Sequence, residues 1–341
     1  MLTLDIEMPA MNGLEVLDYL MTEYPLPIIM VSALTAEGAD VTLRALERGG
    51  VDFITKPINQ DASEIRKLEG LLQSKVRDVF LTRHRVLPMR HADIQHQRPK
   101  INVTIREDAK IESPPPAKRS ESGPLHVRNE TGRGTEFLLV VIGASTGGPN
   151  LLLSIARDLP ATFPAALLIV QHMPKYFTKV FAENLHAVSA FPIREAKDGV
   201  ALEPGVGFVV PGDQHAVIIR ERDSCSRIQF VSESIEYAYR PSIDCAMTSA
   251  AEQFGDNLVG LVVTGMGNDG LMGSQRIKER GGTVLVQDET TSLIYGMPRA
   301  VAEAGFADVV LPDVHIAAAL VEAVSLSCEA NRASASECKS V

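Results

Sequence analysis

The chain has 341 residues, 45% of them apolar, and a formal net charge of −10. This length favours two domains over one. The negative charge argues against a nucleic-acid-binding protein, which would present a basic face. The apolar runs are no longer than single strands, and the residues after Met1 lack the basic start and cleavage site of a secretory leader. We therefore expect a cytoplasmic protein that does not insert into membranes. We also expect a monomer.

Residues 1–82 alternate short apolar strands with amphipathic helices, which indicates a parallel α/β sheet. The expected strands are 2–4, 27–31 and 51–55, and the expected helices are 13–24 and 41–48. Residues 83–134 combine three consecutive prolines with many charges and few apolar residues, so a flexible linker is predicted. The histidines of this segment show no fixed ligand spacing, which favours a solvated linker over a metal site.

Residues 135–330 form a second predicted α/β domain. Its expected strands are 137–142, 165–170, 207–210, 216–219, 227–231, 258–264 and 283–286. Its expected helices are 150–158, 177–186, 245–254, 273–280 and 316–323. The segment 207–231 leaves no room for crossover helices, so we expect an antiparallel hairpin at the edge of a doubly wound, mostly parallel sheet.

The stretch 140–149, Val-Val-Ile-Gly-Ala-Ser-Thr-Gly-Gly-Pro, carries the clearest chemical signal. A buried strand runs into a Gly-x-Ser-x-Gly turn that would expose the Ser145 hydroxyl, and Pro149 suits the first turn of a helix. The free N–H groups of that helix would stabilise an oxyanion. A phosphate loop would need a lysine, and a dinucleotide fingerprint would need a different glycine spacing. A plain tight turn is the alternative to a nucleophile.

Two further strands end in residues that complement a serine nucleophile. His172 follows the strand 165–170, and Asp269 lies in the turn after the strand 258–264. The carboxyl ends of strands in open α/β sheets gather catalysts, so these residues are expected to serve Ser145 as base and orienting acid. Neither a metal nor a cofactor is expected at this site.

Other residues offer weaker alternatives. His186 falls in a predicted helix and His215 in a predicted turn between edge strands, so a structural role is favoured for both. The acids that follow less apolar strands are Asp213, Asp244 and Asp288. The order Ser, His, Asp differs from that of the α/β-hydrolases, so that fold is not expected.

Seven short motifs, in order, resemble the catalytic domain of the chemotaxis response regulator protein-glutamate methylesterases. They are 142–148, 171–174, 177–179, 195–199, 240–242, 264–270 and 296–299. The resemblance implies hydrolysis of glutamate methyl esters on methyl-accepting chemotaxis receptors and deamidation of certain receptor glutamines, which gives sensory adaptation. It also implies that Ser145 attacks the acyl carbon, His172 carries the proton and Asp269 holds the imidazole.

The resemblance implies further roles around these three residues. The backbone N–H groups of Thr146 and Met266 match the oxyanion hole of the family. The residues expected to line the receptor-binding cleft are Arg240, Met297 and Pro298. Tyr239 stands where the family often has a histidine. The rival hypothesis is a non-enzymatic protein that docks receptors in the same cleft, and the reactivity of Ser145 toward a serine-directed acylating probe distinguishes the two.

Three earlier motifs resemble the receiver domain of the same family, which has a flavodoxin-like fold; they are 5–13, 31–35 and 54–57. Asp5 matches the phosphoacceptor, and Ser32 and Lys56 match the residues that sense the phosphoryl group. The resemblance implies a chemotaxis histidine kinase as the partner of an intact receiver, which blocks the active site until it is phosphorylated. The acidic pair that binds Mg²⁺ in this family would precede Met1, so we expect the chain as given to hold a partial receiver that lacks about 50 residues. Either the true start lies upstream of Met1 or the receiver is degenerate.

Overall fold

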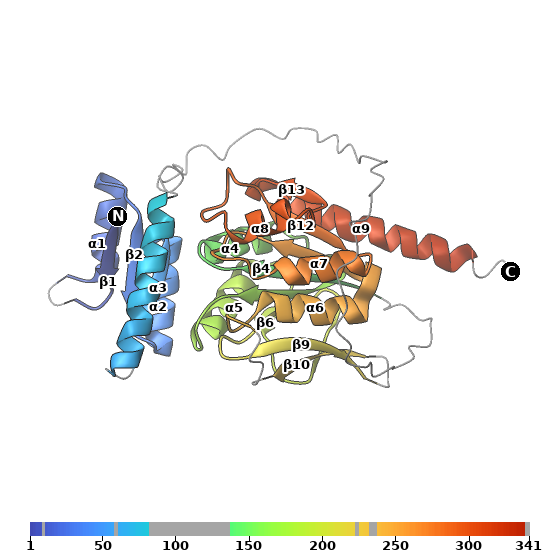
Figure 1. Cartoon of the computed structure of the whole chain (residues 1–341), viewed down its shortest axis with the longest axis horizontal. Helices are drawn as coiled ribbons and strands as arrows, with labels where there is room; N and C mark the ends of the chain where they lie inside the picture. The colour runs from blue at the N-terminus through green and yellow to red at the C-terminus, as the bar shows by residue number, and fades with distance from the viewer. Residues whose placement is uncertain (9–10, 58–60, 82–136, 222–224, 232–236, 338–341) are drawn as a thin grey trace, which may run out of the picture. The chain divides into compact units, whose positions relative to one another are not determined.

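The computed structural model describes residues 1–8, 11–57, 61–81, 137–221, 225–231 and 237–337. Figure 1 shows the helices and strands of these residues and labels most of them. The predicted linker at 83–134 lies outside them. Of the helices in the described ranges, none has both the length and the apolar character that crossing a bilayer requires.

The N-terminal part contains a three-stranded parallel sheet in the order β1-β2-β3, which confirms the predicted partial flavodoxin-like sheet. Its elements are β1 (Leu2–Asp5), α1 (Gly13–Glu23), β2 (Ile28–Ser32), α2 (Ala36–Glu47), β3 (Asp52–Thr55) and α3 (Ala62–Leu81). Helix α2 begins earlier than predicted because the Thr35 hydroxyl accepts a hydrogen bond from the N–H of Gly38 at 3.0 Å. The first residues of α2 are small or acidic, so apolar periodicity does not reveal them.

The C-terminal part is built on a seven-stranded parallel sheet in the order β13-β12-β11-β4-β5-β8-β6, which confirms the predicted α/β class. Its strands are β4 (Leu138–Ala144), β5 (Ala165–Gln171), β6 (Ile193–Glu195), β8 (Gly207–Val209), β11 (Leu258–Val262), β12 (Thr283–Gln287) and β13 (Val309–Leu311). Its helices are α4 (Gly148–Asp158), α5 (Phe177–Val188), α6 (Ile243–Phe254), α7 (Leu271–Glu279), α8 (Met297–Glu303) and α9 (Asp313–Glu337). The elements β6, β13 and α8 were not predicted, because they are too short to show a periodic pattern.

Helices cover both faces of this sheet. Alternate residues of a strand point to opposite faces, so Leu138 and Val140 of β4 pack with α4, α5 and α9. Leu139 and Val141 pack with α6, α7 and α8 on the other face. Every residue of β4 and β5 is buried, as expected for strands covered on both sides. Figure 1 shows α6 and α7 side by side over the strands.

The predicted antiparallel hairpin is present, but as a separate sheet in the order β7-β10-β9 and not as an edge of the main sheet. Its strands are β7 (Val200–Ala201), β9 (His215–Arg220) and β10 (Ser226–Val231). The prediction was wrong for 207–210, because β8 runs parallel between β5 and β6. The chain returns from β6 to β8 through β7, which pairs in the other sheet, so no crossover helix is needed.

Candidate active site

The three residues expected to carry the chemistry follow neighbouring strands of the seven-stranded sheet. Ser145 follows β4, His172 follows β5, and Asp269 lies in the turn between β11 and α7. Strands β11, β4 and β5 are adjacent and parallel, so their carboxyl ends open at the same edge. The tertiary structure therefore brings together residues that are distant in sequence.

Ser145 lies on a sharp turn between β4 and α4. Its N–H donates to the carbonyl of Thr264 at 3.0 Å, and its carbonyl accepts a hydrogen bond from Gly148 at 2.8 Å. Gly147 has a φ of 81°, and a Cβ on it would lie 2.8 Å from the Cβ of Leu293. Glycine is favoured at position 147 because it adopts a positive φ without strain and has no Cβ to meet Leu293.

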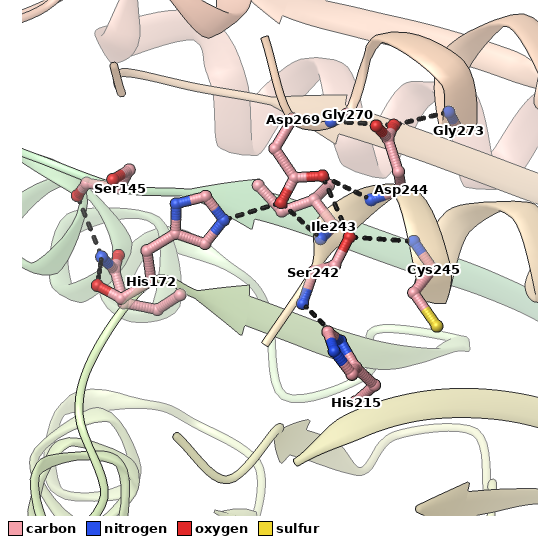
Figure 2. A network of polar contacts seen from close by, with 11 residues as sticks. Ser145, His172, His215, Ser242, Ile243, Asp244, Cys245, Asp269, Gly270 and Gly273 are labelled. Atoms are coloured by element: carbon pink, nitrogen blue, oxygen red, sulfur yellow. Dashed lines mark hydrogen bonds and ion pairs between the residues drawn. The ribbon is translucent and has the colours of Figure 1, made fainter. Parts of the chain in front are cut away.

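His172 and Asp269 are joined by a hydrogen bond. Nε2 of His172 lies 2.7 Å from Oδ2 of Asp269, and the two side chains are only 10% and 5% exposed. The other ring nitrogen, Nδ1, is buried and has no hydrogen-bond partner within the described part of the chain. Figure 2 shows the imidazole between Asp269 and Ser145, with Nδ1 on the side of Ser145. Nε2 of His172 thus contacts the Asp269 carboxylate, while the unpaired Nδ1 faces Ser145.

Asp269 is held at the N-terminus of α6. Its carboxylate accepts hydrogen bonds from the N–H groups of Ile243 at 2.8 Å and Asp244 at 2.9 Å, and from the Ser242 hydroxyl at 3.1 Å. Burial alone would raise the pKa of Asp269, but the hydrogen bond and charge of His172 and the N–H donors hold that pKa below its usual value. An ionised Asp269 favours the imidazole tautomer that carries its proton on Nε2.

Gln171, the last residue of β5, connects the backbones of Ser145 and His172. Its side-chain Nε2 donates to the carbonyl of Ser145 at 2.9 Å and to that of His172 at 3.2 Å. The residue is 2% exposed, so these hydrogen bonds form away from water. The sequence marked Gln171 only as a neighbour of His172, because nothing local to a strand end indicates which carbonyl groups of the next strand lie within reach.

His215 supports the same helix from a buried position at the start of β9, and not in the turn where it was predicted. Its Nδ1 accepts a hydrogen bond from the N–H of Ser242 at 3.2 Å, and the Ser242 side chain caps α6 by accepting from the N–H of Cys245 at 3.2 Å. Burial, and then the charge of Arg240, lowers the pKa of His215, so its ring stays neutral. These contacts agree with the structural role expected for His215.

The two residues expected to form the oxyanion hole lie beside Ser145. Thr146 follows it directly, and Met266 follows Gly265, on which a Cβ would lie 2.7 Å from the Cβ of Ser145. The backbone N–H groups of Thr146 and Met266 have no backbone acceptor among the residues that the structure describes. Two N–H groups near a serine hydroxyl suit the stabilisation of a developing oxyanion.

The expected cleft residues divide into exposed and buried ones. Arg240 is exposed, and Tyr239 before it is half-buried against His172. Met297 and Pro298, the other residues expected to line the cleft, are buried in the first turn of α8. A Cβ on Gly265 would lie 2.4 Å from Sδ of Met297, so this side chain supports the turn from behind and presents no open surface.

The three receiver-like residues also lie at the ends of neighbouring strands. Asp5 ends β1, Ser32 ends β2, and Lys56 follows β3. Nζ of Lys56 lies 2.7 Å from Oδ2 of Asp5, and the Ser32 hydroxyl accepts a hydrogen bond from Thr42 at 2.6 Å. No group of three or more His, Cys, Asp or Glu side chains in the described ranges could hold a metal ion.

Both the N-terminal and the C-terminal part of the chain match known protein families. The model of the CheB methylesterase family matches residues 140–320, and that of the response regulator receiver domain matches residues 1–67. A protein-glutamate methylesterase/protein-glutamine glutaminase of Pyrococcus abyssi is 38% identical over 95% of this chain and 80% of its own. One of Oleidesulfovibrio alaskensis is 39% identical over 94% of this chain and 86% of its own. The crystal structure of the Thermotoga maritima CheB methylesterase catalytic domain matches with a TM-score of 0.53 at 38% identity, over 55% of this chain and 98% of that domain.

Proposed function

Since the chain belongs to the CheB methylesterase family, we propose that it hydrolyses glutamate methyl esters on methyl-accepting chemotaxis receptors in the cytoplasm. The observation that carries the proposal is the 2.7 Å contact between His172 and Asp269, with the free ring nitrogen toward Ser145. A serine, an imidazole and a buried carboxylate in this order support acyl transfer. Deamidation of receptor glutamines passes through the same kind of tetrahedral intermediate and is proposed for the same site.

In the proposed first step, Nδ1 of His172 takes the proton of the Ser145 hydroxyl while Oγ attacks the ester carbonyl carbon. Asp269 stays ionised and stabilises the imidazolium through Nε2–H. The N–H groups of Thr146 and Met266 donate to the oxyanion of the tetrahedral intermediate. The intermediate collapses when the bond to the methoxy oxygen breaks, and methanol leaves with the proton from Nδ1. A glutamyl ester on Ser145 remains.

Water completes the proposed reaction by the same route. Nδ1 of His172 takes one proton from the water as its oxygen attacks the glutamyl ester. The bond from the acyl carbon to Oγ breaks, and the proton returns to Ser145. The products are a glutamate side chain and the free enzyme, and for a glutamine substrate the first leaving group is ammonia.

Methanol release from methylated receptor membranes tests this proposal. We expect release by the wild-type chain and a loss on the order of 10⁴-fold in Ser145→Ala. Ser154→Ala is the matched control, because Ser154 is an exposed serine on α4, the helix that follows the nucleophile. The control should retain the wild-type rate. Near-normal release by Ser145→Ala would contradict the assignment of the nucleophile.

A receptor-docking protein without enzymatic activity predicts a different pattern. In that case neither the wild-type chain nor Ser145→Ala releases methanol, and both bind the receptor equally. A serine-directed acylating probe would also fail to label Ser145. If the chain is an esterase, the acylating probe should label the wild-type chain and should not label Ser145→Ala. A receptor pull-down should retain both proteins equally.

We also propose that the N-terminal part is a receiver in which Asp5 holds the phosphoacceptor position, with a chemotaxis histidine kinase as the partner where the receiver is intact. The ion pair of Asp5 with Lys56 and the match to the receiver family support this role. After treatment with a small phosphodonor and Mg²⁺, mass spectrometry should locate any label on Asp5, and Asp5→Asn should lose it. Asp18→Asn is the control, since Asp18 is a half-exposed carboxylate on α1. Label on a different carboxylate would refute the assignment.

A further inference from the structure

Two buried aspartates exchange hydrogen bonds across the starts of two helices. Asp269 stands before α7, yet it accepts from the first N–H groups of α6. Asp244 lies in the first turn of α6, and its Oδ1 accepts from the N–H groups of Gly270 at 2.9 Å and Gly273 at 2.7 Å at the start of α7. Each helix N-terminus thus binds the carboxylate that belongs to the other one, as Figure 2 shows.

Asp244 supplies an acceptor that α7 does not provide for itself. The N-cap of α7 is Gly270, which has a φ of 97° and no side chain to cap the helix. Buried N–H groups at the start of a helix need acceptors, and Asp244, itself 8% exposed, provides one oxygen for two of them. Gly273 permits the close approach, because a Cβ there would lie 2.5 Å from the Cβ of Met247 on α6.

The hydrogen bond to Gly270 bears on the active site because Gly270 follows Asp269 directly in the chain. The peptide group between these two residues is planar and includes the carbonyl of Asp269, so a hydrogen bond that holds the Gly270 N–H also restricts the backbone of Asp269. The direction of the Asp269 carboxylate toward His172 depends on that backbone. A displacement of about 1 Å in catalytic geometry can lower turnover about 10²-fold.

We propose that Asp244 is a positioning residue of the esterase, whose carboxylate anchors the start of α7 so that Asp269 points at Nε2 of His172. This role rests on the proposed function, because it is a role within that reaction. Asp244 acts through Asp269 and not on the reacting atoms. What the role requires is an acceptor oxygen at the place of Oδ1, so an amide of the same shape can supply it.

Asp244 faces few other titratable groups. Asp269 faces it from the turn before α7, with His172 beyond, and α7 itself contributes backbone N–H groups. Cys245 is its neighbour on α6, and burial raises the pKa of this thiol to about 11, so it stays neutral. The anchoring contact is therefore between a carboxylate and backbone dipoles.

Two substitutions in the full chain test the role. Asp244→Asn keeps an oxygen that can accept from Gly270 and Gly273, so its kcat should stay within about threefold of the wild type. Asp244→Ala removes the acceptor, and its kcat for methanol release should fall at least about tenfold while KM changes less than about threefold. The downfield proton NMR resonance of His172 Nε2–H should keep its wild-type position in the Asn variant and should shift or broaden in the Ala variant.

Asp308→Ala is the matched control. Asp308 accepts from the N–H of Val284 at 2.8 Å and pairs with Lys278, near the start of β12 and so at the opposite end of that strand from the site. It should change neither kcat nor the His172 resonance. A general effect of removing a carboxylate that accepts a backbone N–H would instead lower activity in both alanine variants, and that result would overturn the positioning role.

Results with the Asp244 variants alone can also overturn the positioning role. Wild-type kcat and an unchanged resonance in Asp244→Ala would overturn the proposal, as would a folded Asp244→Asn that is as impaired as the Ala variant. If circular dichroism shows that Asp244→Ala does not fold, the Asn variant decides alone: an unshifted resonance supports the role, and its loss overturns it. If the wild-type chain releases no methanol, the proposed function fails, whereas the resonance still reports whether Asp244 orients Asp269.

Discussion

The ring of Tyr239 stacks on the imidazole of His172, with ring centroids 4.5 Å apart and an angle of 13° between the planes. Burial, and then the charge of Asp269, raises the pKa of the Tyr239 phenol, so the ring is neutral at physiological pH. One face of the imidazole is therefore covered by an aromatic ring while one edge binds Asp269. The stack restricts rotation of the ring about the bond that would take Nε2 away from the carboxylate.

Removing the stack should reduce turnover modestly. An aromatic pair contributes about 0.5–1.5 kcal/mol, so we expect kcat of Tyr239→Ala to fall about two- to tenfold with little change in KM. Tyr239→Phe keeps the ring and should stay within about twofold of the wild type. Initial rates of methanol release at several substrate concentrations measure both parameters. An equal loss in the Phe and Ala variants would assign the effect to the hydroxyl and not to the stack.

The nucleophile and the base should behave as one unit. Ser145→Ala and His172→Ala are each expected to lower turnover on the order of 10⁴-fold or more, and the double variant should be little worse than either, because neither residue works without the other. The measurement is a double-mutant cycle on methanol release, with circular dichroism to verify folding. Losses that multiply in the double variant would show that Ser145 and His172 act independently.

Gln171 should contribute to both stability and rate. Gln171→Met removes two buried hydrogen bonds to the carbonyls of Ser145 and His172, so the free energy of unfolding should fall by about 1–3 kcal/mol. Turnover should also fall, because the Gln171 side chain no longer bridges the carbonyls of Ser145 and His172. Gln275→Met is the control. Among the residues that the structure describes, the Gln275 side chain forms a hydrogen bond only with Glu279, an exposed residue on the same helix. Gln275→Met should match the wild type in urea unfolding and in methanol release. If Gln171→Met also matches the wild type, the bridging role is refuted.

Asp244→Asn should stabilise the protein at neutral pH and not in acid. Burial raises the pKa of Asp244, and the charge of Asp269 raises it further, whereas the hydrogen bonds from backbone N–H groups lower it. The net result is a pKa of about 6 instead of 3.8. A folded-state pKa above the unfolded one means that the wild type loses stability as pH rises from about 4 through about 6, and the loss is complete above that range. The amide does not titrate, so its advantage should grow over the same interval to at most about 3 kcal/mol.

Urea unfolding of the wild type and Asp244→Asn at a series of pH values measures this difference. The two curves should nearly coincide below pH about 4 and separate as the pH approaches 7. Asp308→Asn gives the control for loss of a carboxylate that accepts a backbone N–H. A difference between wild type and Asp244→Asn that is independent of pH would contradict a raised pKa for Asp244.

Much of the site could be predicted from the sequence because its signals are local. Ser145 lies in a Gly-x-Ser-x-Gly turn, and His172 and Asp269 each follow an apolar run of strand length. The repetition of strand and helix implies parallel strands, and parallel strands carry their carboxyl ends to one edge. The order of residue types along the chain therefore indicated that these three would meet.

Other features were decided by the tertiary structure alone. The sequence does not tell which two helix starts lie opposite each other, so it ranked Asp244 as a weaker alternative to Asp269 when in fact the two carboxylates bind each other's helices. The same holds for Tyr239, whose ring meets His172 only because the loop before α6 folds over the end of β5. Strand β8 was predicted antiparallel because short connections favour hairpins, whereas pairing of β7 in a second sheet allows the chain to return in parallel. Each of these contacts joins residues far apart in the chain, and a periodic pattern within one segment carries no information about such distances.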